Sequence, residues 1–340
     1  MSNNWIRHFE LMLLDNNGQG IALSDFKIVF NIEWFNIKFP RVATFKIYNL
    51  STDTTNRIIG QEFSKVQLIA GYRGMKSTES EGDEYPDQNI GELFSGDIRY
   101  SITGKDNPTD TFILIQAADG HNAFINATIN QTLASGYTLA DVNALVMRNL
   151  SPYGITEGPS PDFGSVVFPR GKVFYGMTRD VITNIAAQCN ATWQFVNGKR
   201  VMVRNDAYLH SAIVLNSKTG LIGMPQQTIG AGVNVRCLIN PNIQVNGLIQ
   251  LDQSSVYRAA LSNSDVQMGE VQVGETTQNG NTTVNGVLNT PASIATDGVY
   301  IVKGIAYTGD TRGNEWYMDM MCLARGAGDL LSTSALSRST

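Results

Sequence analysis

The side chains that could carry out chemistry are few and widely separated in this chain. The histidines His8, His121 and His210 form no H-x-x-H or H-E-x-x-H pattern, so the sequence predicts no zinc site. No G-x-S-x-G, G-x-x-x-x-G-K-[ST] or G-x-G-x-x-G motif occurs, which leaves no pattern for a serine nucleophile or for phosphate binding. We therefore expect no catalytic, cofactor-binding or metal-binding residues, and a protein that is not an enzyme.

The cysteines and tryptophans indicate structural roles. Cys189, Cys237 and Cys322 are far apart, odd in number and free of any C-x-x-C pair, so buried free thiols in a reducing compartment are expected. All four tryptophans lie in strand-like segments, where core packing is favoured over a carbohydrate platform. They are Trp5, Trp34, Trp193 and Trp316. The sequence does not exclude a pair of carboxylates that folding brings together, as in the active site of a glycosidase.

The composition limits the class of protein. At 340 residues with 42% hydrophobic residues, the chain has room for two or three domains. It contains no apolar run of about 18 residues that could span a bilayer, and the first ten residues do not read as a signal peptide. A net charge of −5 argues against a protein that grips the phosphates of nucleic acid, so no stable sequence-specific nucleic-acid binding is expected.

The first part of the sequence reads as β-structure. Large apolar residues fall on every second position of 26–34, and an Asn-Asn-Gly turn separates this strand from an apolar run at 9–14, which together predict a hairpin. A strand at 44–50 follows, and Ser51 then reads as the cap of a short helix. Another strand is expected at 66–72, before an acidic loop.

Two segments near the ends of the chain repeat one pattern. Residues 94–120 and 300–326 each read as an alternating strand, a polar turn and a second alternating strand that ends at glycine. With one gap, the alignment places Tyr100 on Tyr307 and Phe112 near Trp316. Strands expected within 213–251 repeat the upstream order: a hairpin, a strand ending near Asn, and a further strand before a long polar loop. The sequence therefore predicts a duplicated β module.

The segment between the two copies has a different pattern. In 121–212, Thr138 is expected to cap one helix and Thr178 a second, each followed by apolar residues at helical spacing. An Asn-Gly pair within 192–204 predicts a tight hairpin. We expect a small α+β insert with its own core.

Three stretches of the sequence resemble phage baseplate hub proteins. Residues 219–228, continued by 232–243, resemble the start of the second barrel in that family. Residues 45–51 resemble its first-barrel strand, and 171–180 the start of a helix in its middle domain. The resemblance covers most of residues 1–326 and is most specific at 219–243.

This resemblance implies a mainly β fold in which two tail-tube-like β-barrels flank a small α+β domain. The domains would be 1–120, 121–212 and 213–328, with a flexible tail at 329–340. The family implies a structural virion protein of a contractile phage, a baseplate hub whose three copies form a pseudo-hexameric ring. That ring would join the hexameric tail tube to the trimeric central spike and line the channel for DNA. The alternatives are a distal-tail or tail-tip protein of a non-contractile phage and a tail-associated cell-wall hydrolase.

The same resemblance implies partners and a location. The partners would be further copies of the chain, the tail tube ring, the spike trimer, the tape-measure protein and the baseplate wedge proteins, with viral DNA passing through. The location would be the tail baseplate of the virion, after synthesis in the host cytoplasm. The loops 75–90 and 263–297 occupy equivalent places in the two copies, and we expect them to reach neighbouring subunits. Their candidate contact residues are Glu79, Glu81, Asp83, Glu84, Asn279, Asn281 and Asn285.

Overall fold

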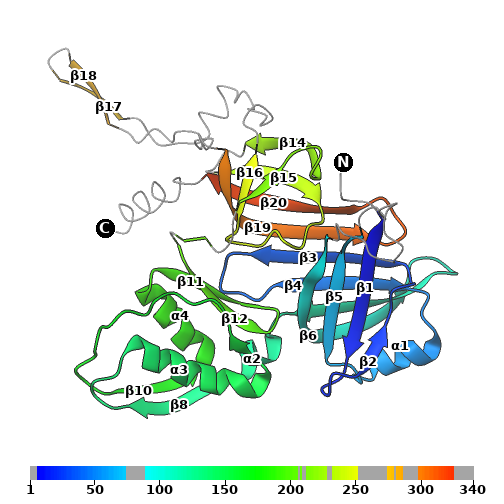
Figure 1. The fold of residues 1–340 in the computed structure, drawn as a ribbon, viewed down its shortest axis with the longest axis horizontal. Helices are drawn as coiled ribbons and strands as arrows, with labels where there is room; N and C mark the ends of the chain where they lie inside the picture. Colours follow the sequence, from blue (N-terminus) through cyan, green and yellow to red (C-terminus); the bar gives the residue numbers. More distant parts are fainter. Residues whose placement is uncertain are drawn as a thin grey trace, which may run out of the picture.

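The computed structural model of this chain is mainly β, with a smaller part that contains most of the helices (Figure 1). It describes residues 6–73, 89–205, 207–208, 212–227, 232–251, 274–278, 281–285 and 298–324. The mainly β fold with an α-containing insert, expected from the sequence, is confirmed.

The elements follow in chain order. The first part contains β1 (Arg7–Leu14), β2 (Gly20–Ala22), β3 (Ile28–Phe35), β4 (Val42–Tyr48), α1 (Thr52–Ile59), β5 (Lys65–Tyr72), β6 (Asn89–Lys105) and β7 (Thr111–Ala118). The insert contains α2 (His121–Asn126), β8 (Thr128–Leu133), α3 (Leu139–Leu150), a 3-10 turn (Ser151–Tyr153), β9 (Thr156–Glu157), β10 (Lys172–Met177), α4 (Thr178–Gln188), β11 (Ala191–Val196) and β12 (Lys199–Arg204). The last part contains β13 (Ile213–Leu215), β14 (Leu221–Gln227), β15 (Val233–Leu238), β16 (Leu248–Leu251), β17 (Gly274–Gln278), β18 (Asn281–Asn285), β19 (Val299–Asp310) and β20 (Trp316–Ala324).

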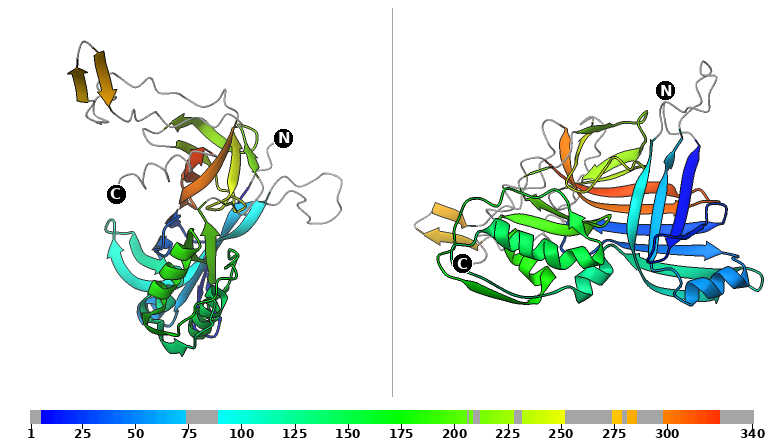
Figure 2. Two further views of the ribbon diagram at one scale, coloured as in Figure 1. Left: turned by 90° about the vertical axis from the view of Figure 1, so that its left-hand side faces the viewer. Right: turned by 60° about the horizontal axis from the view of Figure 1, so that its bottom comes forward.

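One 13-stranded sheet joins the first and last parts of the chain. Its strands run in the order β14-β15-β20-β19-β3-β4-β7-β6-β5-β1-β2, with β16 beside β19 and β13 beside β16. Figures 1 and 2 show the blue strands of the first part continuing into the orange and red strands of the last part. The first part therefore runs β3-β4-β7-β6-β5-β1, and the last part runs β14-β15-β20-β19-β16-β13. The two orders match, except that β13 runs parallel to β16 where β1 runs antiparallel to β5, and β2 has no counterpart.

The long hairpins of the two parts share an irregularity. The β6·β7 register shifts between Ile98 and Tyr100, and the β19·β20 register shifts between Val302 and Gly304. In each case one residue of the longer strand is left out of the register, which is a β-bulge. Aligning the bulges sets Tyr100 on Gly304, so the pairing of Tyr100 with Tyr307 expected from the sequence is wrong by three positions. Because three is an odd number, the sequence alignment placed the exposed side chain of Tyr100 on the buried side chain of Tyr307, on opposite faces of the sheet.

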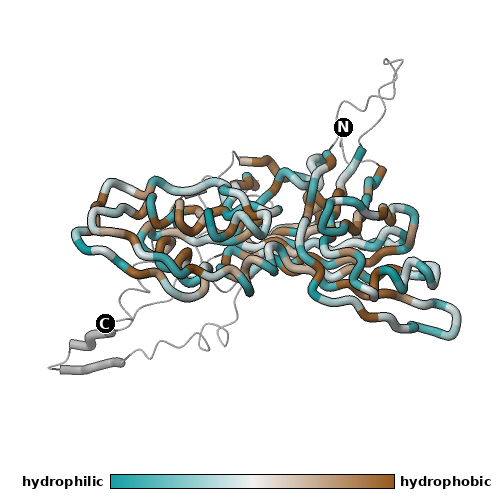
Figure 3. The backbone as a smooth tube through the Cα atoms, turned by 90° about the horizontal axis from the view of Figure 1, so that it is seen from below, coloured by the Kyte–Doolittle hydropathy of each residue, from teal (hydrophilic) through white to brown (hydrophobic). Residues whose placement is uncertain are grey.

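The core of the large sheet is continuous across both parts. Buried side chains of β3, β4 and β7 form one hydrophobic cluster with those of β15, β19 and β20. Alternation places these side chains on one face of each strand, as in β3, where every second residue from Ile28 to Trp34 is buried. Figure 3 shows the corresponding alternation of hydrophobic and polar residues along the strands. Trp34, Trp193 and Trp316 are buried as expected, whereas Trp5 lies outside the described residues.

The insert has a hydrophobic cluster of its own. Helices α3 and α4 pack with β8, β10 and the β9–β12–β11 sheet around buried residues that include Ile182 and Phe195. The predicted capping box forms at Thr138, whose hydroxyl accepts the Asp141 N–H at 3.3 Å. Thr178, however, is not a cap: Met177 occupies that position, and the Thr178 N–H donates instead to the Ala127 carbonyl at 2.9 Å.

Several sequence expectations need correction. The turn after β1 leads to the short strand β2, which pairs with β1, so β3 is free to pair with β4. The expected hairpin of 213–215 with 221–224 does not form, because β13 runs parallel to β16 while β14 pairs with β15. Within the expected loop 263–297, β17 and β18 pair with each other, and the rest of the loop lies outside the described residues.

Candidate assembly surfaces

Strands β3 and β19 form the junction between the two parts of the chain. They pair antiparallel from Phe35 opposite Gly304 to Val29 opposite Asp310. The Asn36 N–H donates to the Lys303 carbonyl at 2.9 Å just beyond one end. The Thr311 N–H donates to the Ile28 carbonyl at 3.0 Å at the other. The junction is therefore a complete strand pairing between segments far apart in the sequence.

At this junction, aromatic rings of β3 pack directly against glycines of β19. A Cβ placed on Gly304 would lie 2.7 Å from the ring of Phe35, and one placed on Gly309 would lie 2.3 Å from the ring of Phe30. On the core side, Phe30 packs edge-on against Trp316 of β20, with ring centroids 5.5 Å apart. The two parts thus share side-chain packing as well as backbone pairing.

Among the strand edges left open in the described residues, which include β2 and β13, two lie at β14 and at the second half of β6. Residues 98–105 of β6 pair with β7, and among the described residues no strand lies on their other side. Strand β14 pairs with β15 and has no second partner within the described ranges. Large apolar side chains are exposed at both edges: Tyr100 and Ile102 at 45% and 52%, and Met224 at 60%. Exposed apolar strand edges favour pairing with another chain.

A groove of about 670 Å³ runs beside the β14 edge on the face turned away from the core. Apolar side chains line much of it, among them Phe35, Ile222, Met224 and Met321. Its charged residues, Arg236 and Asp319, are paired with each other at 2.7 Å. The groove therefore extends the apolar surface of the open edge.

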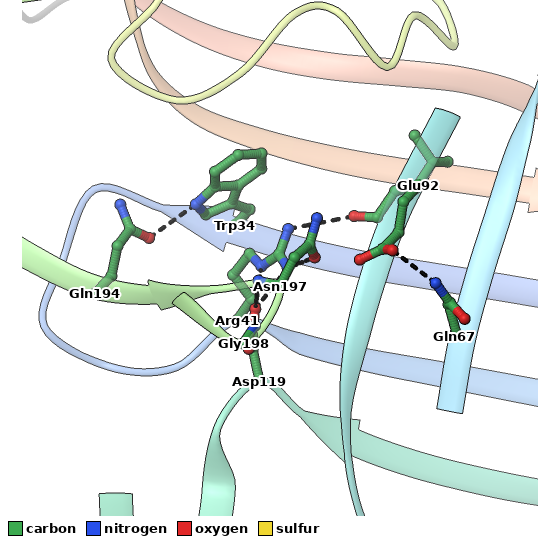
Figure 4. A network of polar contacts seen from close by, with 9 residues as sticks. Trp34, Arg41, Gln67, Glu92, Asp119, Gln194, Asn197 and Gly198 are labelled. Atoms are coloured by element: carbon green, nitrogen blue, oxygen red, sulfur yellow. Dashed lines mark hydrogen bonds and ion pairs between the residues drawn. The ribbon is translucent and has the colours of Figure 1, made fainter. Parts of the chain in front are cut away.

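A buried polar cluster fixes the insert to the sheet (Figure 4). The Arg41 guanidinium donates to the Asp119 carboxylate at 2.6 Å and to the Leu93 carbonyl at 3.2 Å, and it also contacts the Asn197 side chain. The Asp119 carboxylate in turn accepts the Asn197 N–H at 2.6 Å. Arg41 and Asp119 are almost fully buried. Each charge is compensated by its partner, as a buried ion pair requires.

A second set of contacts ties the insert to both parts of the sheet. The Trp34 indole N–H donates to Gln194 of β11 at 2.8 Å. The Asn36 side chain accepts from Thr192 of the insert at 2.9 Å and from Asn246 of the last part at 3.1 Å. These contacts set the orientation of the insert relative to the β3·β19 junction.

Burial shifts the pKa of several ionisable groups among the described residues. Burial raises the pKa of the Cys237 and Cys322 thiols, and of the partly exposed Cys189 thiol, so none is activated as a thiolate. Burial also raises the pKa of Asp97 and lowers that of the Lys303 ammonium. Within the described part of the chain, no group of three or more His, Cys, Asp or Glu side chains is arranged to hold a metal ion. No helix in that part is long and apolar enough to cross a membrane.

The contact residues expected from the sequence are not brought together into a described site. Glu79, Glu81, Asp83, Glu84 and Asn279 lie outside the described residues. The backbones of Asn281 and Asn285 belong to β18, but the structure does not describe their side chains. Sequence reasoning missed Arg41 and Asp119 because a single Arg and Asp far apart carry no spacing signal. It also missed the open edges, which depend on strand order.

The fold is that of solved tail proteins. No family model matches the chain. A search of curated proteins also found no match. The chain is similar to the 43 kDa tail protein of prophage MuSo2 from Shewanella oneidensis, with a TM-score of 0.55 at 10% identity, covering 94% of this chain and 99% of that one.

Two further structures give the same result. A tail protein from Neisseria meningitidis MC58 has a TM-score of 0.51 at 8% identity, covering 95% of this chain and 98% of that one. A Francisella PdpA–VgrG complex, described as half-lidded, has a TM-score of 0.52 at 6% identity, covering 96% of this chain and 59% of that one. At these identities the likeness shows the fold, which this chain shares with both tail proteins over nearly their whole length.

Proposed function

We propose that this protein is a structural component of a phage tail, and specifically a baseplate hub whose three copies form a pseudo-hexameric ring. The observation that carries the proposal is the duplicated strand order, β3-β4-β7-β6-β5-β1 and β14-β15-β20-β19-β16-β13. A chain with two similar modules presents six modules in three copies. Such a ring fits a sixfold tube on one side and a threefold spike on the other.

In this proposal the repeats correspond to 1–120 and 213–328, and the insert to 121–212, with 329–340 as a tail. The insert occurs once for every two modules, so it marks the threefold symmetry of the ring. The partners would be the tail tube ring, the spike trimer, the tape-measure protein and the wedge proteins of the baseplate. The tail-protein fold shared with the MuSo2 and Neisseria proteins supports a location in the virion tail.

The charges on the sheet face turned away from the core suit a channel for DNA. Lys46 of β4 and Arg236 of β15 occupy equivalent positions in the two modules. Lys46 is paired with Asp106 at 2.7 Å and Arg236 with Asp319 at 2.7 Å. A cation that is paired with a carboxylate attracts a phosphate less strongly than a free cation does, so this face would favour sliding of DNA over tight binding.

The proposal is tested by the number of copies in the assembled particle. We expect electron cryo-microscopy of tails that contain this protein, with mass measurement of the released ring, to show three copies around the tail axis. A single copy or a ring of six copies would contradict the hub and would favour a different tail component. Hydrolysis of peptidoglycan by the purified protein would instead support the cell-wall hydrolase.

A further inference from the structure

A hollow between the insert and the β3–β4 connection is lined by aromatic rings and charged side chains. It has a volume of about 200 Å³ and lies where residues 38–39 meet α2, α4 and β11. The ring centroid of Phe39 lies 6.5 Å from that of Phe124, which in turn lies 6.4 Å from that of Trp193. Three rings from separate parts of the chain therefore form one apolar surface.

The side chains at this hollow differ in exposure. Trp193 is 3% exposed, and its indole N–H donates to the Thr183 hydroxyl at 3.1 Å, so this ring forms a fixed base. Phe39, in contrast, is 55% exposed. Ile125, which directly follows Phe124 in α2, is 43% exposed. Exposed apolar side chains beside a buried aromatic base are typical of a contact site for another molecule.

The charges around the hollow are positive on balance. The Lys38 ammonium lies 5.7 Å from the Phe39 ring centroid, and the Arg179 guanidinium lies 4.9 Å from that of Phe124. Neither cation forms an ion pair with a carboxylate of the described residues. Asp180 also lines the hollow, so two cations and one carboxylate leave a local charge of +1 in a chain whose net charge is −5. The hollow therefore favours an acidic ligand.

Hydrogen bonds within the insert hold this lining in place. The Arg179 guanidinium donates to the Phe124 carbonyl at 2.8 Å, which joins α4 to α2. The Thr183 hydroxyl, which accepts from Trp193, donates to the Arg179 carbonyl at 2.8 Å. A lining that is already ordered loses little conformational entropy when a ligand binds.

The size of the hollow and the state of its rings indicate the class of ligand. A volume of about 200 Å³ is less than the roughly 300–1,000 Å³ of sites that hold small-molecule ligands, and it suits one large side chain. Single-stranded nucleic acid needs open ring faces on which bases stack, whereas Arg179 lies over Phe124 and Trp193 is buried. A protein segment therefore fits better than either alternative.

We propose that this hollow binds an acidic segment of a partner protein. The segment inserts one large apolar side chain between Phe39 and Trp193 and places carboxylates beside Lys38 and Arg179. Apolar anchors dominate the affinity of such contacts, while exposed charges mainly add specificity. Because the hollow includes residues of the insert, the contact occurs once per chain and not once per β module. The inference does not depend on the number of copies in the assembled particle.

Titration of the full chain with labelled hexapeptides tests the proposal. One probe contains a phenylalanine flanked by aspartates, and two matched probes replace the phenylalanine by serine or the aspartates by lysines. We expect the acidic phenylalanine probe to bind about tenfold more tightly than either matched probe. In NMR spectra, the indole N–H signal of Trp193 should shift on binding, while that of Trp316 stays in place.

Variants of the chain locate the binding. Phe39→Ser and Lys38→Glu change exposed side chains, and each should weaken binding of the acidic probe about fivefold or more. Lys218→Glu, in the turn before β14, is the matched control and should bind like the unaltered chain. Equal binding by Lys38→Glu and Lys218→Glu would overturn the proposal. Equal binding of all three probes, or binding of none, would overturn it as well.

Other occupants of the hollow have distinct outcomes in the same experiment. Tighter binding of an oligothymidine than of the acidic probe, lost in Phe39→Ser, would identify a site for single-stranded nucleic acid. Self-association that falls in Phe39→Ser, without binding of any probe, would identify a second copy of the chain. Either result would overturn the proposed partner.

Discussion

Arg41 connects three parts of the chain through one guanidinium group. It contacts Asp119, which directly follows β7, the Leu93 carbonyl of β6 and the side chain of Asn197 in the β11–β12 turn of the insert. Its guanidinium also lies over the ring of Trp34, at 4.7 Å from the centroid. At the scale of single residues, this cluster is what holds the insert in place.

We expect Arg41→Met to lower the free energy of unfolding by about 3–5 kcal/mol, because it leaves the Asp119 carboxylate buried without a partner. Urea denaturation measures the change. Arg57→Met is the matched control: Arg57 pairs with Glu62 on the surface, where solvent screens the ion pair and its loss should change stability little. Equal losses in the two variants would show that the buried cluster has no special role.

The second prediction concerns the buried carboxyl of Asp97. Burial raises its pKa, although its carboxylate accepts the Asn122 N–H at 2.8 Å. A carboxyl with a higher pKa in the folded chain stabilises the fold most when protonated, and that stability is lost as pH rises through the folded value. We expect Asp97→Asn to raise the free energy of unfolding at neutral pH, by on the order of 1 kcal/mol, and to have little effect near about pH 3.

Asp141 provides a control of opposite sign for this pH experiment. The Thr138 N–H holds the pKa of the Asp141 carboxyl below its ordinary value. Its contribution is present above the unfolded pKa and disappears as pH falls through the folded value. Asp141→Asn should therefore reduce stability at neutral pH. If both variants shift the unfolding midpoint in the same direction, the assignment of Asp97 is wrong.

The elements were largely readable in the sequence, but their partners were not. Period-two alternation predicted β3 and β19, and the cap at Ser51 predicted α1, because these signals are local. The β3·β19 pairing joins segments that are far apart in the chain, and no local signal specifies which edge meets which. The same limit explains the errors at 213–224, where a good turn suggested a hairpin that the structure does not form.

Glycine at position 309 of β19 makes room for the ring of Phe30. We expect Gly309→Ala to destabilise the chain by about 1–3 kcal/mol, because the added Cβ would lie 2.3 Å from that ring. In a Phe30→Leu background the same substitution should cost less, since the smaller side chain leaves space. Denaturation of all four chains measures the coupling. Additive losses would mean that the glycine is needed for another reason.

The molecule as a whole has two cores of different extent. One runs through both parts of the large sheet, and the other is confined to the insert. The sequence indicated the duplication and the insert through repeated patterns. It did not show that the two β parts share one sheet, because a shared core depends on the β3·β19 junction. The two β parts should therefore unfold together.

Native-state hydrogen exchange tests this shared unfolding. Ile305→Ala removes a fully buried side chain of β19 and should lower protection in β3 and β4 as well as in β20, by about 2–5 kcal/mol. Protection in β11 and β12 should stay higher. The matched variant Ile182→Ala, in the insert core, should have the reverse pattern. Unchanged exchange in β3 after Ile305→Ala would show that the two β parts unfold independently.

The β3·β19 junction also affects how assembly depends on protein concentration. Two modules held in one chain meet at an effective concentration fixed by the connection, independent of how much protein is present. In the proposed ring every second joint is of this kind, and only the others depend on collisions between molecules. Assembly would then depend less steeply on concentration than for a ring of separate modules. Scarce protein could still close the ring.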